Sequence, residues 1–224
     1  MFKFNNISSD IMKVVVEEEE SFLGKAEKRY EVIEIEGKDG AIYNELGYAM
    51  IDRPIKLQIL DVSKLDEIFA WLDGKGILEY KNRITNAIFS SVIDPQRVST
   101  IKVAEFNFIR EPFWYKKNDD FISVLDTVYN EGNVKSRPII RIEKQIESNV
   151  DITINNIRFL YTFENDEEYV EIDCENMIAT YENLIRNRNL EIGFEFPSLD
   201  VGENIVTLNS GDSIIKFKRK DRWL

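Results

Sequence analysis

Residues 196–205 read Phe-Pro-Ser-Leu-Asp-Val-Gly-Glu-Asn-Ile, a pattern that separates two β-strands. Proline restricts φ and has no N–H donor, so the Phe-Pro pair indicates the end of one strand. The glycine and asparagine that follow favour a turn, and Ile205–Leu208 then begins another strand. Turn formers at Asn209–Asp212 precede a further apolar run, Ile214–Lys218, so the sequence predicts a closing β-hairpin.

Most of the remaining chain is also predicted to be β. Short apolar or alternating runs are punctuated by glycine, asparagine, aspartate or proline, as expected of strands joined by turns. The helices that a parallel α/β fold needs between its strands are largely missing, so the fold class is mainly β. The predicted strands are Met12–Glu18, Arg29–Glu36, Ile55–Leu60, Ile84–Ile93, Thr100–Ile109, Ile139–Ile142, Val150–Ile154, Arg158–Phe163, Tyr169–Asp173 and Leu190–Phe196.

One helix is predicted between two of these strands. Ser63 can cap its N-terminus, and Gly74 and Gly76 can end it. The Trp71 indole is expected to pack in the core beside the apolar stripe rather than to stack on a ligand. The stripe has the i, i+3, i+4, i+7 spacing of a helix: Leu65, Ile68, Phe69 and Leu72.

The pattern changes in the middle of the chain. Residues 116–120 (Lys-Lys-Asn-Asp-Asp) form a polar break, residues 130–133 are rich in turn formers, and a strand-like run follows. A domain boundary is therefore expected near residue 130, which gives domains 1–129 and 130–224.

The chain carries a net charge of −12, but its end is basic. Residues 216–222 hold five basic groups and one acid, or +4, which leaves −16 for the rest. Lysines on an edge strand commonly keep that strand soluble, and this is the simpler interpretation. Alternatively, a cationic strip contacts the acidic face of a neighbouring subunit. The strip comprises Lys216, Lys218, Arg219, Lys220 and Arg222.

The composition excludes several kinds of chemistry. Histidine is absent, so neither a Ser-His-Asp triad nor a histidine-based zinc site can form. Cys174 is the single cysteine and is expected to be a packed side chain in a protein made in a reducing cytoplasm. No run approaches the roughly 20 apolar residues of a membrane span, and no signal peptide is visible at the N-terminus.

Two polar loops contain residue types that are found in ion or phosphate sites. Asn165–Glu168 offers oxygen ligands for calcium but lacks the EF-hand spacing, so a polar hairpin tip is the simpler account. Gly37–Gly40 lacks the spacing of a phosphate loop and is also interpreted as a loop or hairpin tip. No cofactor, metal site or catalytic constellation is predicted.

An ordered series of short motifs resembles the distal tail protein (Dit) family of long, flexible-tailed phages. Asn5-Asn6 stands where the family usually has Asn-Gly, and Glu143-Lys144 stands where it often has glycines. The motifs run the length of the chain: residues 4–9, 35–40, 71–78, 106–109, 111–115, 130–132, 136–140, 154–157, 172–173 and 196–199.

The resemblance implies a structural protein of the phage tail tip, or baseplate hub. A β-sandwich-like N-terminal domain with one helix and an extended hairpin would form a homo-hexameric ring, and a galectin-like C-terminal β-sandwich would point outward. The ring would join the major tail tube protein to the tail-associated tip protein, and could anchor receptor-binding proteins. The chain has no room for the carbohydrate-binding insertions of longer relatives. Such a protein is made in the bacterial host cytoplasm and resides in the virion tail tip.

A ring with head-to-tail interfaces also gives the charged segments a role. The basic strip and the loop residues Lys38 and Asp39 become candidate assembly contacts. The acidic surplus would keep DNA in the lumen from binding, so no direct nucleic-acid or membrane partner is expected.

The sequence leaves two other functions open. A glycan-binding module for host cell-wall attachment could stack sugars on Trp114, Tyr115 and Trp223, although isolated aromatics more often lie in a core or an interface. A carboxylate-dependent wall hydrolase is the second, and nothing in the sequence favours it. The chain is therefore predicted not to be an enzyme.

Overall fold

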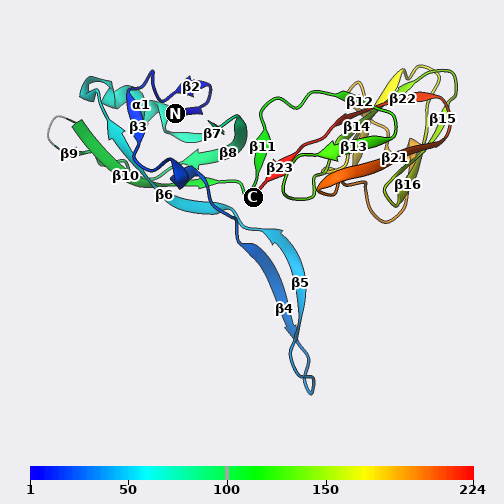
Figure 1. Ribbon diagram of the computed structural model, residues 1–224, viewed down its shortest axis with the longest axis horizontal. Helices are drawn as coiled ribbons and strands as arrows, with labels where there is room; N and C mark the ends of the chain where they lie inside the picture. The colour runs from blue at the N-terminus through cyan, green and yellow to red at the C-terminus, as the bar shows by residue number, and fades with distance from the viewer. Residues whose placement is uncertain (99–100) are drawn as a thin grey trace. The chain divides into compact units, whose positions relative to one another are not determined.

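The structure, a computed structural model, describes residues 1–98 and 101–224. Its strands are antiparallel and dominate the chain, which confirms the mainly β fold class (Figure 1). The chain divides into two compact units, Met1–Lys117 with Leu224, and Asn118–Trp223.

This division falls in the polar break rather than near residue 130. The strand β13 (Thr127–Asn130) belongs to the second unit, where it pairs with β21 (Gly202–Ser210). The turn formers after residue 130 thus shape a loop of that unit, and the polar segment 116–120 contains the division itself.

The first unit is organised around one antiparallel sheet with the strand order β2-β1-β7-β8-β10-β6-β3. Alternate residues of β10 are buried, namely Ala104, Phe106 and Phe108, because one face of the sheet covers the core. The expected strand 100–109 is present as β10, and Thr100 itself lies outside the described residues. The strands are β1 (Phe2–Phe4), β2 (Ile7–Ser8), β3 (Val14–Val16), β6 (Ile51–Ile59), β7 (Gly74–Tyr80), β8 (Arg83–Phe89), β9 (Gln96–Val98), β10 (Ile101–Arg110) and β11 (Trp114–Lys116).

The predicted helix is α1 (Leu65–Trp71), which follows the 3-10 turn η2 (Val62–Lys64). Trp71 is buried as expected; its indole Nε1–H donates to the Phe4 carbonyl at 2.9 Å. Ser63 does not cap α1: it is a donor, and its N–H binds the Asp61 side chain at 3.0 Å. Phe69 was expected in the apolar stripe but is 37% exposed, because this short helix buries only one side.

Two strands of the first unit form a separate two-stranded ribbon, β4 (Lys28–Glu34) and β5 (Ala41–Tyr48) (Figure 1). The loop at residues 37–40 joins them, as the hairpin interpretation predicted. Gly37 and Gly40 have φ of 78° and 81°, a region that glycine occupies without steric cost. A 3-10 turn, η1 (Glu19–Phe22), precedes the ribbon.

The second unit contains two sheets whose inner faces share one apolar core. Ile140, Ile172 and Phe217 come from the first sheet, and Ile152 and Phe159 come from the second. One sheet has the order β12 (Ile122–Val124), β22 (Ser213–Lys218), β14 (Ile139–Lys144), β17 (Tyr169–Asp173), β18 (Ile178–Tyr181) and β19 (Leu184–Ile185). The other has the order β13, β21, β15 (Asn149–Ile154), β16 (Ile157–Thr162) and β20 (Leu190–Ile192). The remaining elements are η3 (Asn187–Asn189) and β23 (Arg222–Trp223).

The closing β-hairpin predicted from the C-terminal motif is wrong. β21 and β22 are consecutive strands but lie in different sheets, so they do not pair with each other. The connection passes Gly211, whose φ of 95° takes the chain from one sheet to the other. A Cβ at this glycine would lie 2.5 Å from the Asn149 carbonyl oxygen, so the crossing also needs the missing side chain.

Among the described residues, no helix is long and apolar enough to cross a bilayer.

Candidate functional site

The C-terminal motif forms a polar junction centred on Asn204. This side chain is fully buried, and its Oδ1 accepts from the Asp200 N–H at 2.7 Å and from Asn155 Nδ2 at 2.9 Å. Its Nδ2 donates to the carbonyls of Asp200 at 2.9 Å and Gly202 at 3.0 Å. The asparagine predicted to form a turn therefore holds the whole turn in place from inside.

Other motif residues extend the same junction. Asn130 Nδ2 donates to the carbonyls of Val134 at 3.0 Å and Leu199 at 3.1 Å, and its Oδ1 accepts from the Gly132 N–H at 2.9 Å. Ser136 and Leu199 exchange two backbone hydrogen bonds, each of 2.9 Å. Sequence segments 130–136, 154–155 and 196–205 thus meet in one place, and their polar groups are satisfied by one another.

The basic strip is largely neutralised within the second unit. Lys216 Nζ lies 2.7 Å from Glu143 Oε1, and Arg219 Nη2 lies 3.0 Å from Glu131 Oε1. The Arg222 Nε–H donates to the Lys135 carbonyl at 2.7 Å. In the described part of the chain, the ammonium groups of Lys218 and Lys220 have no ion pair.

A buried carboxyl, Asp221, lies inside this segment. Its Oδ2 is 2.9 Å from Arg219 Nη2, and the residue is fully buried. Burial raises the pKa of Asp221, and the attraction of Arg219 opposes that rise. Much of the positive charge near the end of the chain therefore compensates nearby acids rather than forming an open strip.

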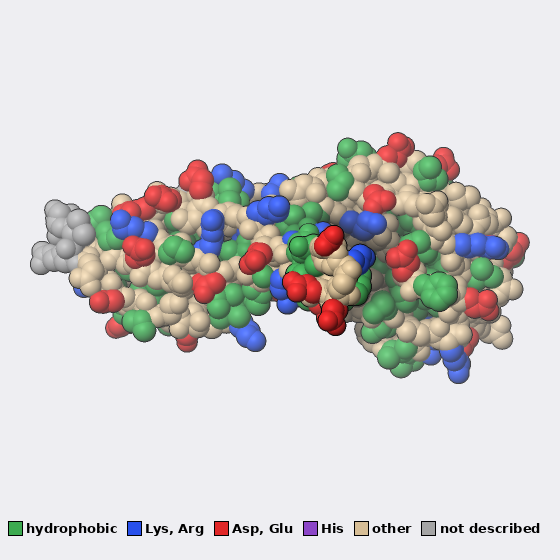
Figure 2. Space-filling view, turned by 90° about the horizontal axis from the view of Figure 1, so that it is seen from below, with side chains coloured by type: hydrophobic (Ala, Val, Ile, Leu, Met, Phe, Trp, Pro, Cys, Tyr) green, Lys and Arg blue, Asp and Glu red, His purple; other side chains and the backbone are tan. Residues whose placement is uncertain are grey.

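The remaining predicted contacts, Lys38 and Asp39, lie at the tip of the β4–β5 hairpin and are exposed. Figure 2 looks onto this tip, where acidic side chains lie among hydrophobic ones. Charges of both signs are interspersed over the rest of the face in view.

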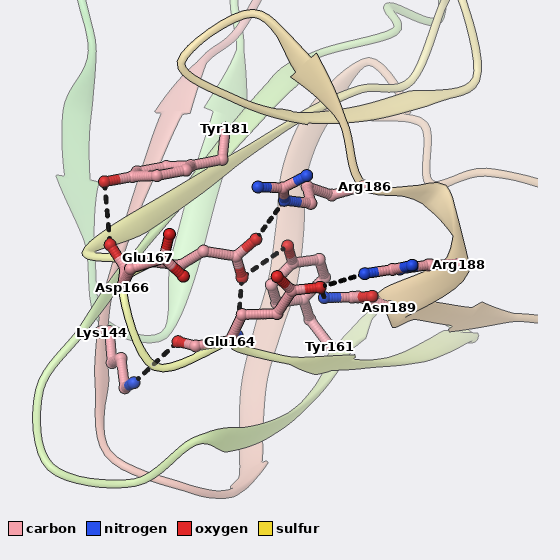
Figure 3. Close-up of polar contacts among 9 residues, drawn as sticks. All are labelled: Lys144, Tyr161, Glu164, Asp166, Glu167, Tyr181, Arg186, Arg188 and Asn189. Atoms are coloured by element: carbon pink, nitrogen blue, oxygen red, sulfur yellow. Dashed lines mark hydrogen bonds and ion pairs between the residues drawn. The ribbon is translucent and has the colours of Figure 1, made fainter.

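The loop 163–168 is a sheet crossing rather than the expected hairpin tip, because β16 and β17 lie in different sheets. Its Glu167 carboxylate is buried and binds three groups: Arg186 Nε at 2.5 Å, the Tyr161 hydroxyl at 3.1 Å and the Glu164 N–H at 2.9 Å (Figure 3). Sequence reasoning missed this network, because nothing local distinguishes Glu167 from the acids beside it.

Neighbouring side chains complete the network around this crossing. Arg188 Nη2 lies 2.6 Å from Glu164 Oε1, and Lys144 Nζ donates to the Glu164 carbonyl at 3.2 Å (Figure 3). The Tyr181 hydroxyl donates to the Asp166 carbonyl at 3.0 Å. Glu167 is therefore committed to Arg186 and Tyr161 and does not serve as a cation ligand here.

The described residues offer little for catalysis. They contain no group of three or more acidic or cysteine side chains that could hold a metal ion. Cys174 is buried as expected, and burial raises the pKa of its thiol, which disfavours the reactive thiolate. The glycan-binding interpretation required an accessible Trp114, but Trp114 is buried and cannot stack on a sugar.

Comparison with known proteins supports the sequence resemblance. Residues 131–223 match the model of the siphovirus-type tail component, C-terminal domain, which indicates a structural component of a phage tail. No curated relative matches the chain.

Solved structures give the fold of the whole chain. The Dit protein of phage SPP1, described as a paradigm of the hub adsorption apparatus in phages that infect Gram-positive bacteria, has a TM-score of 0.70 at 10% identity. That match covers 100% of this chain and 98% of the other. A chain of the phage P2 baseplate in its activated conformation with calcium has a TM-score of 0.45 at 9% identity and covers 96% of both chains. The resemblance to the distal tail protein family is therefore confirmed, by sequence over residues 131–223 and by fold over the whole chain.

Proposed function

We propose that this chain is a hub protein of a phage tail tip that assembles as a homo-hexameric ring. The ring joins the major tail tube protein to the tail-associated tip protein and offers attachment for receptor-binding proteins. The observation that carries the proposal is the match of residues 131–223 to a siphovirus-type tail component. The fold shared with the SPP1 protein, a hub of an adsorption apparatus, is consistent with it. A structural role also needs no catalytic site.

The β4–β5 hairpin supports self-association. Val32 and Tyr43 are cross-strand partners, 52% and 65% exposed, and Ile33 and Ile42 on the other face are 38% and 40% exposed. A two-stranded ribbon is marginally stable in water without a surface to pack on. Exposed apolar side chains on both faces are therefore best explained by a neighbouring subunit that covers them.

Fewer charged residues remain as candidates for contacts between subunits than were predicted from the sequence. Arg219 and Arg222 hold loops of their own unit, and Lys216 is paired with Glu143, so these three act mainly within the subunit. Lys218 and Lys220, together with Lys38 and Asp39 at the hairpin tip, are the charges that we propose for contacts between subunits.

Purified protein examined by light scattering and negative-stain electron microscopy tests the ring. We expect a closed ring with the mass of six chains. Val32→Asp with Tyr43→Asp places two charges on one hairpin face and should shift the protein to monomers. Leu184→Asp, the same kind of change at a 56% exposed residue of the second unit, is the matched control and should leave the ring intact. A monomeric wild type in the presence of its tail tube protein would refute the proposal.

A further inference from the structure

A surface depression of about 630 Å³ lies over β14 and the loops next to it. Its lining includes Arg141, Glu143, Lys144 and Tyr169 from the paired strands β14 and β17, and Gln145 and Asp166 from the loops. This depression lies on the outer side of the six-stranded sheet, because the alternate residues Ile140 and Ile142 of β14 face the core. The tail-tip function proposed above makes no use of it.

The polar groups on its floor are held in place by one another. Arg141 Nε lies 3.1 Å from Glu143 Oε1, and Arg141 Nη1 lies 3.0 Å from Glu171 Oε1. The Arg141 guanidinium also lies over the Tyr169 ring, 3.8 Å from its centroid. A ligand would therefore meet groups whose conformational freedom is already reduced, which lowers the entropy cost of binding.

One wall is equally constrained. The buried Glu167 anchors the 163–168 crossing through Tyr161 and Arg186, and Tyr181 holds the Asp166 carbonyl (Figure 3). The hydrogen bonds of Glu167 and Tyr181 therefore hold the backbone of this loop, and the Asp166 side chain extends from it into the wall of the depression. The depression is built into the fold rather than formed by loose surface chains.

The balance of charge indicates what kind of ligand fits. Glu143 is held ionised by Lys216, whose hydrogen bond lowers the pKa of Glu143, and Arg141 lies between two carboxylates. The described residues leave Arg141 Nη2 and the Asp166 carboxylate without hydrogen-bond partners. The lining carries two cations, Arg141 and Lys144, against four carboxylates, of which Glu143 pairs with Lys216 and Glu167 with Arg186. With these partners and Glu171 included, the net charge is only −1, so the site offers donors and acceptors together with little net charge. Hydroxyl groups use both kinds of partner at once, whereas a simple anion or cation uses only one.

We propose that this depression is a binding site for a neutral saccharide. Arg141 and Lys144 would donate to sugar hydroxyl oxygens, and Glu143 and Asp166 would accept from sugar hydroxyls. The site differs from the aromatic set Trp114, Tyr115 and Trp223 considered from the sequence, and it is independent of ring assembly.

Titration of the ¹⁵N-labelled protein with glucose, galactose, rhamnose and N-acetylglucosamine tests this. We expect at least one sugar to give saturable amide shifts at residues 141–145 and 165–169, with a dissociation constant of about 1 mM. Arg141→Gln and Glu143→Gln should each weaken binding at least tenfold, roughly the effect of one lost charged hydrogen bond.

Arg158→Gln is the matched control, because Arg158 is also an arginine paired with a carboxylate, Asp151, but lies on the other sheet. It should leave sugar binding unchanged. Saturable shifts that survive both Arg141→Gln and Glu143→Gln would overturn the proposal. So would the absence of shifts with all four sugars, or shifts with tetralysine only, which would identify an acidic protein-binding surface instead.

Discussion

Replacing Asn204 by alanine should loosen the end of the second unit where the C-terminal motif lies. The side chain is fully buried and makes four hydrogen bonds of 2.7–3.0 Å, to Asp200 twice, to Gly202 and to Asn155. Alanine removes all four and leaves the partner groups unsatisfied wherever water cannot reach them.

The magnitude follows from the number of bonds and the exposure of their partners. Each bond contributes about 0.5–1.5 kcal/mol net, so four bonds bracket a loss of roughly 2–6 kcal/mol. Asp200 is exposed, so water can replace part of its bonding. We therefore expect a loss of about 3 kcal/mol in the free energy of unfolding.

Hydrogen exchange read by mass spectrometry can localise this loss. Amides of β15 and β16 should exchange roughly 100-fold faster in Asn204→Ala, since about 1.4 kcal/mol corresponds to a factor of ten. Asn156→Ala changes an exposed asparagine in the same region and serves as the control. Less than a threefold acceleration, or an equal acceleration in β6 and β10 of the first unit, would refute the reasoning.

Three further changes test other parts of the second unit. Gly132→Ala would place a Cβ 2.3 Å from the Arg222 carbonyl oxygen and should cost about 2 kcal/mol in a urea titration, whereas Gly193→Ala, with no atom within 4 Å, should be neutral. Glu167→Gln removes the charge that Arg186 binds and should lower the free energy of unfolding by about 3 kcal/mol in the same titration. Glu168→Gln, at the exposed neighbour, should lower it little, and equal effects of the two changes would contradict the network. Burial raises the folded-state pKa of Asp221, so the wild-type protein loses stability as pH rises through that pKa and the buried carboxyl ionises. The urea midpoint of Asp221→Asn relative to that of the wild type should therefore rise from pH 4 to pH 7. A difference that does not change with pH would exclude this account.

The strands could be predicted where alternation is strong. β15 and β17 match the predicted runs Val150–Ile154 and Tyr169–Asp173, because each places alternate apolar residues into the sandwich core. β5 (Ala41–Tyr48) was not predicted, because exposed residues on both faces give no alternation.

Sheet membership could not be predicted. The Asn209–Asp212 turn signal is genuine, but a turn that crosses between sheets and a turn that closes a hairpin use the same residue types. Strands far away in the sequence decide which kind of turn forms. β21 pairs with β13 and β15, whereas β22 pairs with β12 and β14. The same limit applies to 163–168, where the polar composition suggested a tip and the structure has a buried anchor.

Several motifs that carry the family resemblance meet at the junction around Asn204. Their role there is structural, so these motifs say little about assembly. Asn130, Ser136, Leu199 and Asn204 are all buried. Asn130 and Ser136 both bond to Leu199, and Asn204 bonds to Asn155 and to the Val128 carbonyl, so segments far apart in sequence satisfy one another's polar groups. Residues with that role are restricted by the fold, because each must fill a buried place and also meet a hydrogen-bond partner there. Buried residues cannot contact a neighbouring subunit, however. A contact with a neighbouring subunit must therefore use exposed residues, and the β4–β5 hairpin exposes apolar side chains on both faces, Val32 and Tyr43 on one and Ile33 and Ile42 on the other.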